Sequence, residues 1–267
     1  MITYNKEKVE KANNWLDSTI HVVTDFDRTI TVGNSESSWS VLSKSELVPK
    51  EYVKERQEFY NYYRPYEIDE TLDYETKNKL MIEWWNKHIN LFIKYKLKES
   101  VINDAARNLR VMSFREGPKE FLESMRDRNI PVIIISAGIG NFIEQFLIKN
   151  NCNFDNIYII SNFIKFKDGI AVGVCENVIH SLNKNEVSLP NDVKEMIKDR
   201  PNIILLGDSI SDIRMVKEED REDTLKIGFL EEKIEENKIY FKKSFDVVAT
   251  NNTTYTELFE KVRILKK

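Results

Sequence analysis

The strongest constraint on the fold is a short apolar run near the start of the chain that ends at two acidic residues. Residues 20–24 are Ile-His-Val-Val-Thr, and Asp25 and Asp27 follow with one phenylalanine between them. If the strand continued over residues 20–26, both carboxylates would face one side of its carboxyl end, because side chains two apart in a strand point the same way. Open α/β sheets place their ligands at such strand ends. The pattern therefore predicts a site whose carboxylates can bind a divalent cation, attack phosphorus or transfer a proton.

Further apolar runs alternate with helical segments over the second half of the chain. This alternation predicts an α/β fold with a Rossmann-like parallel sheet that helices cover on both faces. Asp168-Gly169 is typical of a hairpin turn within residues 162–174. Strands are expected over residues 131–136, 156–160, 203–206, 225–229 and 245–249, and helices over residues 5–16, 118–129, 141–149, 231–241 and 255–265.

The segment between the first two expected strands has a different character. Aromatic residues recur at helical spacing over residues 51–63, 74–97 and 99–112, and glycine is absent from Ser35 through Glu116. These features predict a packed helical block. We therefore expect a core formed by residues 1–34 and 113–267, and an inserted helical cap formed by residues 35–112.

The composition excludes several classes of partner. The 267 residues are 41% hydrophobic, which suits one large domain or a core with an inserted subdomain. A formal net charge of −4 gives no basic excess, so neither nucleic acid nor an anionic membrane is expected as a partner. No apolar run is long enough to span a bilayer, the N-terminal residues lack the apolar stretch of a secretory signal, and there are only two cysteines. We expect a cytoplasmic protein, and leave pairing of the cysteines open.

Polar residues end two more of the expected strands. Ser136 enters a glycine-containing turn, where its hydroxyl and the backbone N–H groups can hold phosphate oxygens. Asp208 and Asp212 follow residues 203–206, and clustered carboxylates suit Mg²⁺. Each of these residues, like the Asp-x-Asp-x-Thr pattern itself, also fits an ordinary turn or helix cap.

In chain order, these residues and one lysine resemble the four motifs of the haloacid dehalogenase-like (HAD) superfamily. Lys184 is chosen on this resemblance alone, because most lysines are solvated surface residues. Within the superfamily the chain is similar to the cytosolic 5′-nucleotidase III, or pyrimidine 5′-nucleotidase, family from about residue 20 to the C-terminus. The similarity is carried by Ile-Ser-Ala-Gly-Ile-Gly (135–140), Ser-Asn-Phe (161–163), Ile-His-Ser-Leu-Asn-Lys (179–184), residues 202–209 and residues 225–230, and more weakly by residues 67–69 and 82–85.

The resemblance implies hydrolysis of a phosphate monoester through an aspartyl-phosphate. Asp25 would be the nucleophile, and Asp27 would protonate the leaving oxygen and then deprotonate the attacking water. A proton on Asp27 is reasonable because two close carboxylates resist joint ionisation. The expected ligands of Mg²⁺ are Asp25, the backbone carbonyl of Asp27, and Asp208, with Asp212 nearby.

The resemblance also implies which residues contact the phosphate and which contact the nucleobase. Ser136, the Ala137 backbone N–H and Lys184 would hold the remaining phosphate oxygens. In the cap, Glu67 would accept hydrogen bonds from the base and Trp85 would stack on it, although its neighbour Trp84 means that at least one of the two belongs to the cap core.

The preferred base stays open at this point. His88 stands where the family is expected to have a small polar residue, and a tryptophan suits a cationic base such as 7-methylguanine as well as a pyrimidine. His21 and His180 are expected to be structural. The expected substrate is a nucleoside 5′-monophosphate, and the expected oligomeric state is a monomer.

Three alternatives remain. One is a phosphatase of this fold for a non-nucleotide phosphomonoester, such as phosphoserine or a sugar phosphate. The second is a catalytically silent binding protein on the same fold, and the third is phosphotransfer to a nucleoside instead of water. The cap sequences and the complete set of acidic residues favour a nucleotidase over the first two, whereas the third would use the same intermediate.

Overall fold

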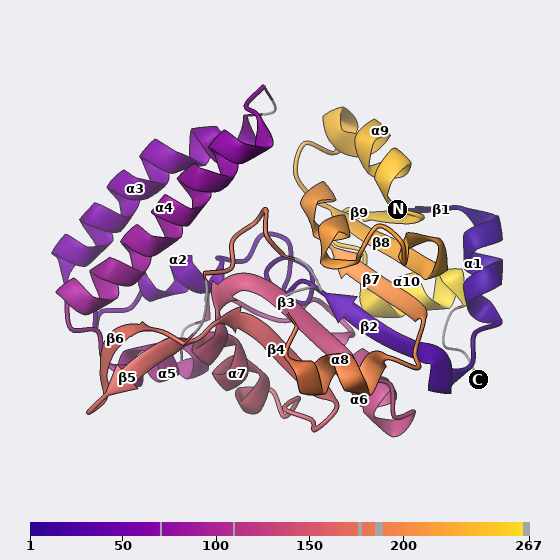
Figure 1. The fold of residues 1–267 in the computed structure, drawn as a ribbon, viewed down its shortest axis with the longest axis horizontal. Coiled ribbons are helices and arrows are strands. Elements are labelled where there is room, and N and C mark those ends of the chain that lie inside the picture. Colours follow the sequence, from indigo (N-terminus) through magenta and orange to yellow (C-terminus); the bar gives the residue numbers. More distant parts are fainter. Residues whose placement is uncertain (70, 109, 176–177, 185–188, 264–267) are drawn as a thin grey trace.

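A mostly parallel sheet forms the centre of the computed structural model, which describes residues 1–69, 71–108, 110–175, 178–184 and 189–263. Within these residues the sheet has seven strands in the order β1-β9-β8-β7-β2-β3-β4 (Figure 1). Every neighbouring pair is parallel except β1, which runs antiparallel to β9 at one edge. The strands are β1 (Ile2–Tyr4), β2 (Ile20–Thr24), β3 (Val132–Ile139), β4 (Ile157–Asn162), β7 (Asn202–Gly207), β8 (Thr224–Leu230) and β9 (Val247–Thr250).

Helices cover both faces of this sheet because its central strands are apolar on both sides. In β3, Val132 and Ile134 pack with α6 and α7, whereas Ile133 and Ile135 pack on the other face with α8. Fully buried parallel strands have this continuous apolar character. The helices of the core are α1 (Lys6–Asn13), α6 (Pro118–Asp127), α7 (Gly140–Lys149), α8 (Asn191–Ile197), α9 (Ile234–Ser244) and α10 (Tyr255–Val262). The expected α/β class is confirmed.

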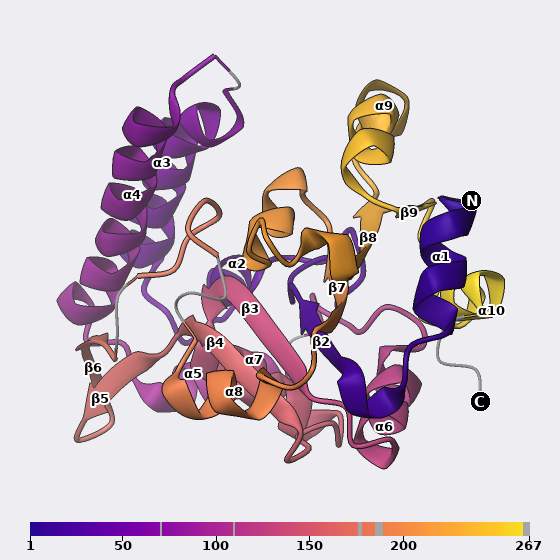
Figure 2. The ribbon, with the colours of Figure 1, turned by 45° about the vertical axis from the view of Figure 1, so that its right-hand side comes forward.

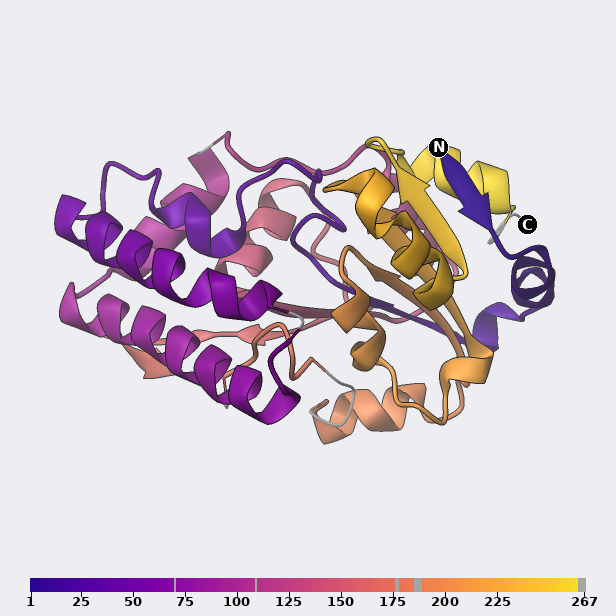
Figure 3. The same cartoon turned by 90° about the horizontal axis from the view of Figure 1, so that it is seen from above.

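A helical insert, which we define as residues 38–108, lies between β2 and β3. It contains α2 (Ser38–Leu42), α3 (Lys50–Ile68), α4 (Tyr74–Lys94) and α5 (Glu99–Asn108). Figures 1 and 2 show α3 and α4 as an antiparallel pair that stands away from the sheet, and Figure 3 shows them side by side. Aromatic rings join the pair, since Trp84 stacks on Tyr63 with ring centroids 5.8 Å apart. By contrast, α5 packs against α7 of the core.

A small hairpin of β5 (Ile164–Lys167) and β6 (Ile170–Val174) packs against α4. Its turn has left-handed backbone at Asp168 (φ 50) and Gly169 (φ 73), which is the geometry that tight hairpins favour. The hairpin expected around Asp168-Gly169 is therefore confirmed.

Several expected boundaries were wrong. The strand expected over 20–26 ends at Thr24, because the N–H groups of Ile30 and Thr31 both donate to the Phe26 carbonyl and close a turn. Arg28 takes a left-handed conformation (φ 62) within that turn. Conversely, β3 continues past Ser136 to Ile139 with an irregular register. Three short elements, β1, α2 and α8, were not expected.

Several expected helices are shorter than the sequence suggested. The helix over 5–16 ends at Asn13, the helix over 99–112 ends at Asn108, and the helix over 255–265 ends at Val262. Parts of the last two expectations, residues 109 and 264–265, lie outside the described residues. No helix in the described ranges combines the length and the apolar character needed to cross a bilayer.

Both cysteines are free thiols in the part of the chain that the structure describes. Cys152 is buried, and burial raises its pKa to about 11, whereas Cys175 is exposed. The pairing that the sequence left open is therefore not formed.

Candidate active site

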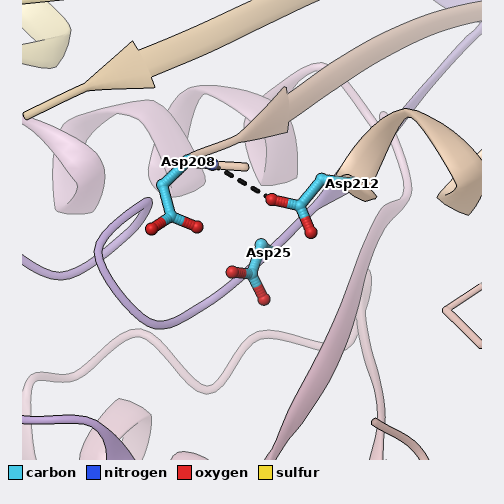
Figure 4. Close-up of side chains that lie close together, drawn as sticks. All are labelled: Asp25, Asp208 and Asp212. Atoms are coloured by element: carbon cyan, nitrogen blue, oxygen red, sulfur yellow. Dashed lines mark hydrogen bonds between the residues drawn. The ribbon is translucent and has the colours of Figure 1, made fainter. Parts of the chain in front are cut away.

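Three aspartates from two distant parts of the sequence meet at the carboxyl end of the sheet. Asp25, Asp208 and Asp212 each offer a carboxylate oxygen, and these atoms all lie within 4.8 Å of one another (Figure 4). Asp25 follows β2 and Asp208 follows the adjacent parallel strand β7. The Asp25 N–H still donates to the Leu206 carbonyl at 3.0 Å, which holds the two strand ends together. The convergence expected from the strand ends is thus present.

Asp212 belongs to the cluster and also caps the 3₁₀ helix Ile210–Met215, in whose first turn it lies. Its Oδ2 accepts the N–H groups of Asp208 and Ser209 at 3.1 and 2.9 Å. A Cβ at Gly207 would come within 2.6 Å of the Asp212 Cβ, so glycine is needed for this close approach. The functional and the capping interpretations of Asp212 are therefore compatible.

Lys184 supplies a positive charge inside the cluster. Its Nζ donates to Asp25 Oδ1 at 2.7 Å and to Asp212 Oδ1 at 3.1 Å, and the residue is only 6% exposed. Burial alone would lower the pKa of the Lys184 ammonium, but the charges of Asp212 and Asp25 reverse this and the pKa is raised. Lys184 therefore stays protonated beside the acids.

The cluster has the properties of a site for a hard divalent cation. Among the described residues, none donates a hydrogen bond to the Asp208 carboxylate. Burial, and then the charges of Asp212 and Asp25, raise the pKa of Asp208 well above its usual range. Burial likewise raises the pKa of Asp25 to about 7, against the attraction of Lys184. An all-oxygen donor set with an unpartnered carboxylate fits Mg²⁺.

Asp27 is held by the insert and does not join the cluster through its carboxylate. Its Oδ1 accepts the Ser38 N–H at 3.1 Å, and its Oδ2 accepts the Ser38 hydroxyl at 3.2 Å. Burial raises the pKa of Asp27 to about 6, and the hydrogen bonds from Ser38 oppose this rise. A Cβ at Gly138 would lie 2.3 Å from Ser38 Oγ, so Gly138 leaves the room that Ser38 needs.

Ser136 and Ala137 lie where β3 passes the cluster. The Ser136 hydroxyl accepts the Gly138 N–H at 3.1 Å. The Ala137 carbonyl accepts the indole N–H groups of Trp39 and Trp85 at 2.8 and 2.9 Å, so two side chains of the insert are bound to this strand.

A single cavity of about 490 Å³ joins the strand ends to the insert. This volume is in the range of small-molecule sites. Every predicted site residue except Asp212 lines it, and Asp212 lies directly beside it through Lys184 and Asp208. The lining includes Asp25, Asp27, Ser136, Ala137, Lys184 and Asp208 from the core, and Arg56, Glu67, Trp84, Trp85 and His88 from the insert.

The three predicted base-binding residues have distinct surroundings. Glu67 forms an ion pair with Arg64 one turn earlier. Trp85 is 8% exposed and packs edge-on against Trp84, so both tryptophans line the cavity. His88 is buried, which lowers its pKa to about 3 and keeps its ring neutral.

The other two histidines have structural contacts, as expected. His21 Nδ1 is hydrogen-bonded to the Arg200 carbonyl at 2.8 Å, and His180 Nδ1 accepts the Leu182 N–H at 3.2 Å.

Two residues of the site region were not predicted: Ser38, which holds the Asp27 carboxylate, and Arg56, which lines the cavity. Ser38 lies in a serine-rich stretch, and serine there is equally typical of a helix cap. Arg56 is buried on α3, in helical phase with Tyr52, Phe59 and Tyr63. An arginine in phase with an aromatic stripe was the signal that could have identified it.

Acidic residues at the carboxyl end of a parallel sheet, with a lysine among them and a helical insert above, define a HAD-like phosphohydrolase fold. Phosphoserine phosphatase with bound substrate shares this fold, with a TM-score of 0.58 and 18% identity over 91% of this chain and 97% of that chain. The sequence model of the pyrimidine 5′-nucleotidase (UMPH-1) family matches residues 21–265, and the chain belongs to that family.

Individual relatives agree with this assignment. The chain is 34% identical over 243 residues to the 7-methylguanosine phosphate-specific 5′-nucleotidase of Homo sapiens, covering 88% of this chain and 81% of that protein. The Drosophila melanogaster protein of the same name is 32% identical over 244 residues, covering 88% and 76%. The crystal structure of cytosolic 5′-nucleotidase IIIB bound to cytidine matches with a TM-score of 0.88 and 27% identity, over 99% of this chain and 93% of that chain. The family expected from the sequence motifs is confirmed.

Proposed function

We propose that this chain hydrolyses nucleoside 5′-monophosphates to a nucleoside and inorganic phosphate. The observation that carries the proposal is the position of Asp25, between the Lys184 ammonium and the Asp208 carboxylate in a cavity that reaches the aromatic insert. The family and the cytidine-bound relative support a nucleotide substrate. The relatives named for 7-methylguanosine phosphate indicate that the base varies within the family.

Asp25 attacks phosphorus through a carboxylate oxygen, so that an Asp25–phosphorus bond forms while the bond to the 5′-oxygen breaks. Asp27 gives its proton to that oxygen, and it then takes a proton from the water that cleaves the aspartyl-phosphate. Burial favours the protonated form of both acids. Lys184 opposes this at Asp25, where the nucleophile must be ionised, and a bound cation would oppose it further.

Other groups of the site would neutralise the negative charge of the phosphate. Lys184, the Ser136 hydroxyl and the Ala137 N–H hold phosphate oxygens. Asp25, Asp208 and the Asp27 carbonyl, with Asp212 nearby, would hold Mg²⁺. When bound, Mg²⁺ lets two anions approach and stabilises the charge on the transferred group.

Residues 35–112 act as a cap that receives the nucleoside, with Trp85 against the base and Glu67 and His88 at its edge. All three line the cavity together with the catalytic residues. We expect the protein to work in the cytosol, in keeping with the name of the cytosolic relative, and as a monomer.

The test is phosphate release from CMP, UMP, AMP, GMP and 7-methyl-GMP, with and without Mg²⁺, by the wild type and by Asp25→Asn. We expect magnesium-dependent release by the wild type, and a loss of about 10⁴-fold or more in kcat for the variant, because the nucleophile is removed while the cavity is kept. Asp192→Asn, an exposed site on α8, is the matched control and should retain wild-type turnover.

Three results would contradict the proposal. Substantial steady-state turnover by Asp25→Asn would exclude Asp25 as the nucleophile. Faster release from phosphoserine or a sugar phosphate than from every nucleotide would identify a different phosphatase. No turnover of any phosphate ester with Mg²⁺ would indicate a binding protein on this fold.

A further inference from the structure

The last residue of β4 is a buried asparagine whose side chain bonds to two segments of the active site. Asn162 is 3% exposed, and its amide NH2 group donates to three carbonyls, those of Ile179, Ala137 and Gly138, at 2.8, 2.9 and 3.2 Å. Its Oδ1 accepts the Ile179 N–H at 2.9 Å. An amide side chain carries both donors and an acceptor, so it can pair with both backbone groups of Ile179 and with the end of β3 at once.

The first of these segments is the end of β3, which we assign to the phosphate. The Ala137 carbonyl also accepts the indole N–H groups of Trp39 and Trp85. The Gly138 carbonyl also accepts the Ser161 hydroxyl, at 2.9 Å. Both carbonyls of this strand end therefore keep other donors when the amide is removed.

The second segment, residues 178–184, carries Lys184 and belongs to no helix or strand. Within the described residues, Asn162 is the sole hydrogen-bond partner of the Ile179 N–H and carbonyl. It also forms the only hydrogen bonds that join the backbone of this segment to the sheet in the part of the chain that the structure describes. Loss of the amide therefore affects the segment that carries Lys184 more than it affects the end of β3.

A turn closed by Asn183 carries this constraint to the lysine. The Asn183 side chain accepts the His180 N–H at 2.7 Å and donates to the Val178 carbonyl at 2.9 Å. Lys184 follows directly, and its Nζ reaches two acids of the cluster. A lysine ammonium is a point charge on a flexible stem, so its position depends on the backbone that carries it.

We propose that Asn162 is a positioning residue that holds Lys184 at the phosphate. This inference rests on the part of the proposed function that assigns Lys184 to a phosphate oxygen. Asn162 itself does not line the cavity. Its amide instead sets the position of the lysine segment relative to the end of β3, where Ser136 and the Ala137 N–H bind the same phosphate. A misplacement of about 1 Å at such a site can cost on the order of 100-fold in rate.

A double-mutant cycle tests whether Asn162 acts through the lysine. The cycle compares kcat/KM with Mg²⁺ for the wild type, Asn162→Ala, Lys184→Met and the double variant. The substrates are CMP and, separately, p-nitrophenyl phosphate, which has no nucleobase. We expect Asn162→Ala to lower kcat/KM by about 10- to 100-fold in the wild type and by less than about twofold in Lys184→Met, because a residue that acts through Lys184 has no effect once the lysine is gone.

The same cycle on the dissociation constant of inorganic phosphate, measured by calorimetry with Mg²⁺, needs no turnover. Asn162→Ala should raise this constant by about tenfold when Lys184 is present, since it weakens a charge-assisted hydrogen bond to the phosphate. It should leave the constant unchanged in Lys184→Met. If Asn162→Ala does not fold, Asn162→Ser, which keeps a hydroxyl in place of the amide, replaces it in both cycles.

Asn141→Ala is the matched control, because Asn141 also pairs with both backbone groups of a single residue. Its Oδ1 accepts the Ile164 N–H at 2.7 Å, and its Nδ2 donates to the Ile164 carbonyl at 3.4 Å, at the start of the hairpin of β5 and β6. This variant loses a similar pair of hydrogen bonds away from Lys184, so it should keep the wild-type kcat/KM and phosphate affinity.

The outcomes separate this inference from the proposed function. An equal loss in the presence and absence of Lys184, or an unchanged kcat/KM in Asn162→Ala, would overturn this inference alone, since nucleotides would still be hydrolysed. Turnover of p-nitrophenyl phosphate without turnover of any nucleotide would overturn the proposed substrate. A coupled cycle on p-nitrophenyl phosphate would support the role of Asn162 even then.

Discussion

Asp25 and Asp27 lie two positions apart and yet have different partners. Asp25 faces Lys184 and the acidic cluster, whereas Asp27 is held by Ser38 of the insert. The alternation of a strand would have placed both on one face, but β2 ends at Thr24 and the chain turns directly after Asp25. The identity of the two acids could therefore be predicted from the sequence, while their separation could not.

Some site residues could be predicted from the sequence and others could not, and this difference has a physical reason. Asp208 could be predicted because it follows an apolar run and matches the order of the superfamily motifs, although its position alone also fits a helix cap. Ser38 could not, because a serine satisfies many local needs, and its contact with Asp27 depends on tertiary packing. Arg56 required knowledge of which face of α3 is buried.

Arg115 is the residue that supports the turn carrying Asp27. Its guanidinium donates to the Arg28 and Thr29 carbonyls at 2.9 and 3.4 Å, and it pairs with Glu231 at 2.7 Å. The side chain is 1% exposed and lies over the Phe229 ring. One side chain thus joins the turn after β2 to the end of β8.

We expect Arg115→Met to lower the free energy of unfolding by about 3–5 kcal/mol, because it leaves the Glu231 carboxylate buried without its partner. Urea unfolding at fixed Mg²⁺ measures this change. Arg126→Met removes an arginine of the same size whose side chain is 46% exposed, and it should cost less than about 1 kcal/mol. Equal losses of unfolding free energy in the two variants would contradict a special contribution of the buried Arg115–Glu231 pair.

At the scale of elements, the insert is attached to the sheet mainly where α2 and α4 meet the end of β3. The indoles of Trp39 on α2 and Trp85 on α4 donate to the same Ala137 carbonyl. Asn162 of β4 donates to this oxygen as well, at 2.9 Å. Because the donors share one acceptor, each can partly replace another.

We therefore expect Trp39→Phe and Trp85→Phe to be coupled. The double variant should lose about 0.5–1 kcal/mol more than the two single variants together, because only then does the carbonyl lose both indole donors. A double-mutant cycle of urea unfolding measures the coupling, and the cost of the smaller rings cancels in the cycle. The cycle of Trp39→Phe with Trp15→Phe, at a distant half-buried site, should be additive. Additivity in both cycles would contradict this account.

The existence of most elements could be predicted from the sequence, and their ends could not. Apolar runs and aromatic spacing identified β2, β3, β7, α3 and α4. By contrast, β1 has three residues and pairs on one side only, so its sequence carries little pattern. The extension of β3 to Ile139 depends on β4 pairing with it beyond an irregularity.

At the scale of the whole molecule, the order of the strands lay beyond the sequence. Parallel strands of similar apolar composition can exchange neighbours without changing the pattern of any one of them. Binding of one cation by the acids after β2 and β7 requires these strand ends to be close, and the two strands are adjacent. The expected chemistry is thus consistent with this neighbour pair, which the pattern of hydrophobicity does not specify.

The acidic cluster makes global stability depend on both pH and Mg²⁺. Without the cation, burial raises the pKa values of Asp25 and Asp27 to about 7 and 6, above those of the unfolded chain. Their contribution to stability is therefore fully present below about pH 4, and it is lost as the pH rises through 6 and 7. His88 and His180 act in the opposite direction, because their pKa values are lowered to about 3 and 4.

We expect Mg²⁺ to raise the melting temperature strongly at pH 8 and little at pH 5, because the cation binds ionised carboxylates. At a concentration of about 100 Kd the gain at pH 8 should be roughly 2–3 kcal/mol. Comparing melting curves with Mg²⁺ and with EDTA at each pH separates this effect from the histidines, which are the same in both. Asp208→Asn should lose most of the Mg²⁺ shift, and a shift that does not depend on pH would contradict a carboxylate site.

Separate stretches of the chain form the two ends of the cavity, and this has a consequence for how substrate selectivity evolves. Asp25, Ser136, Lys184 and Asp208 belong to the core, whereas Arg56, Glu67, Trp85 and His88 belong to two helices of the insert. Substitutions in those helices can retune which leaving group is accepted while the hydrolytic apparatus is inherited unchanged. Chimeras that exchange α3 and α4 between family members would transfer selectivity as a module.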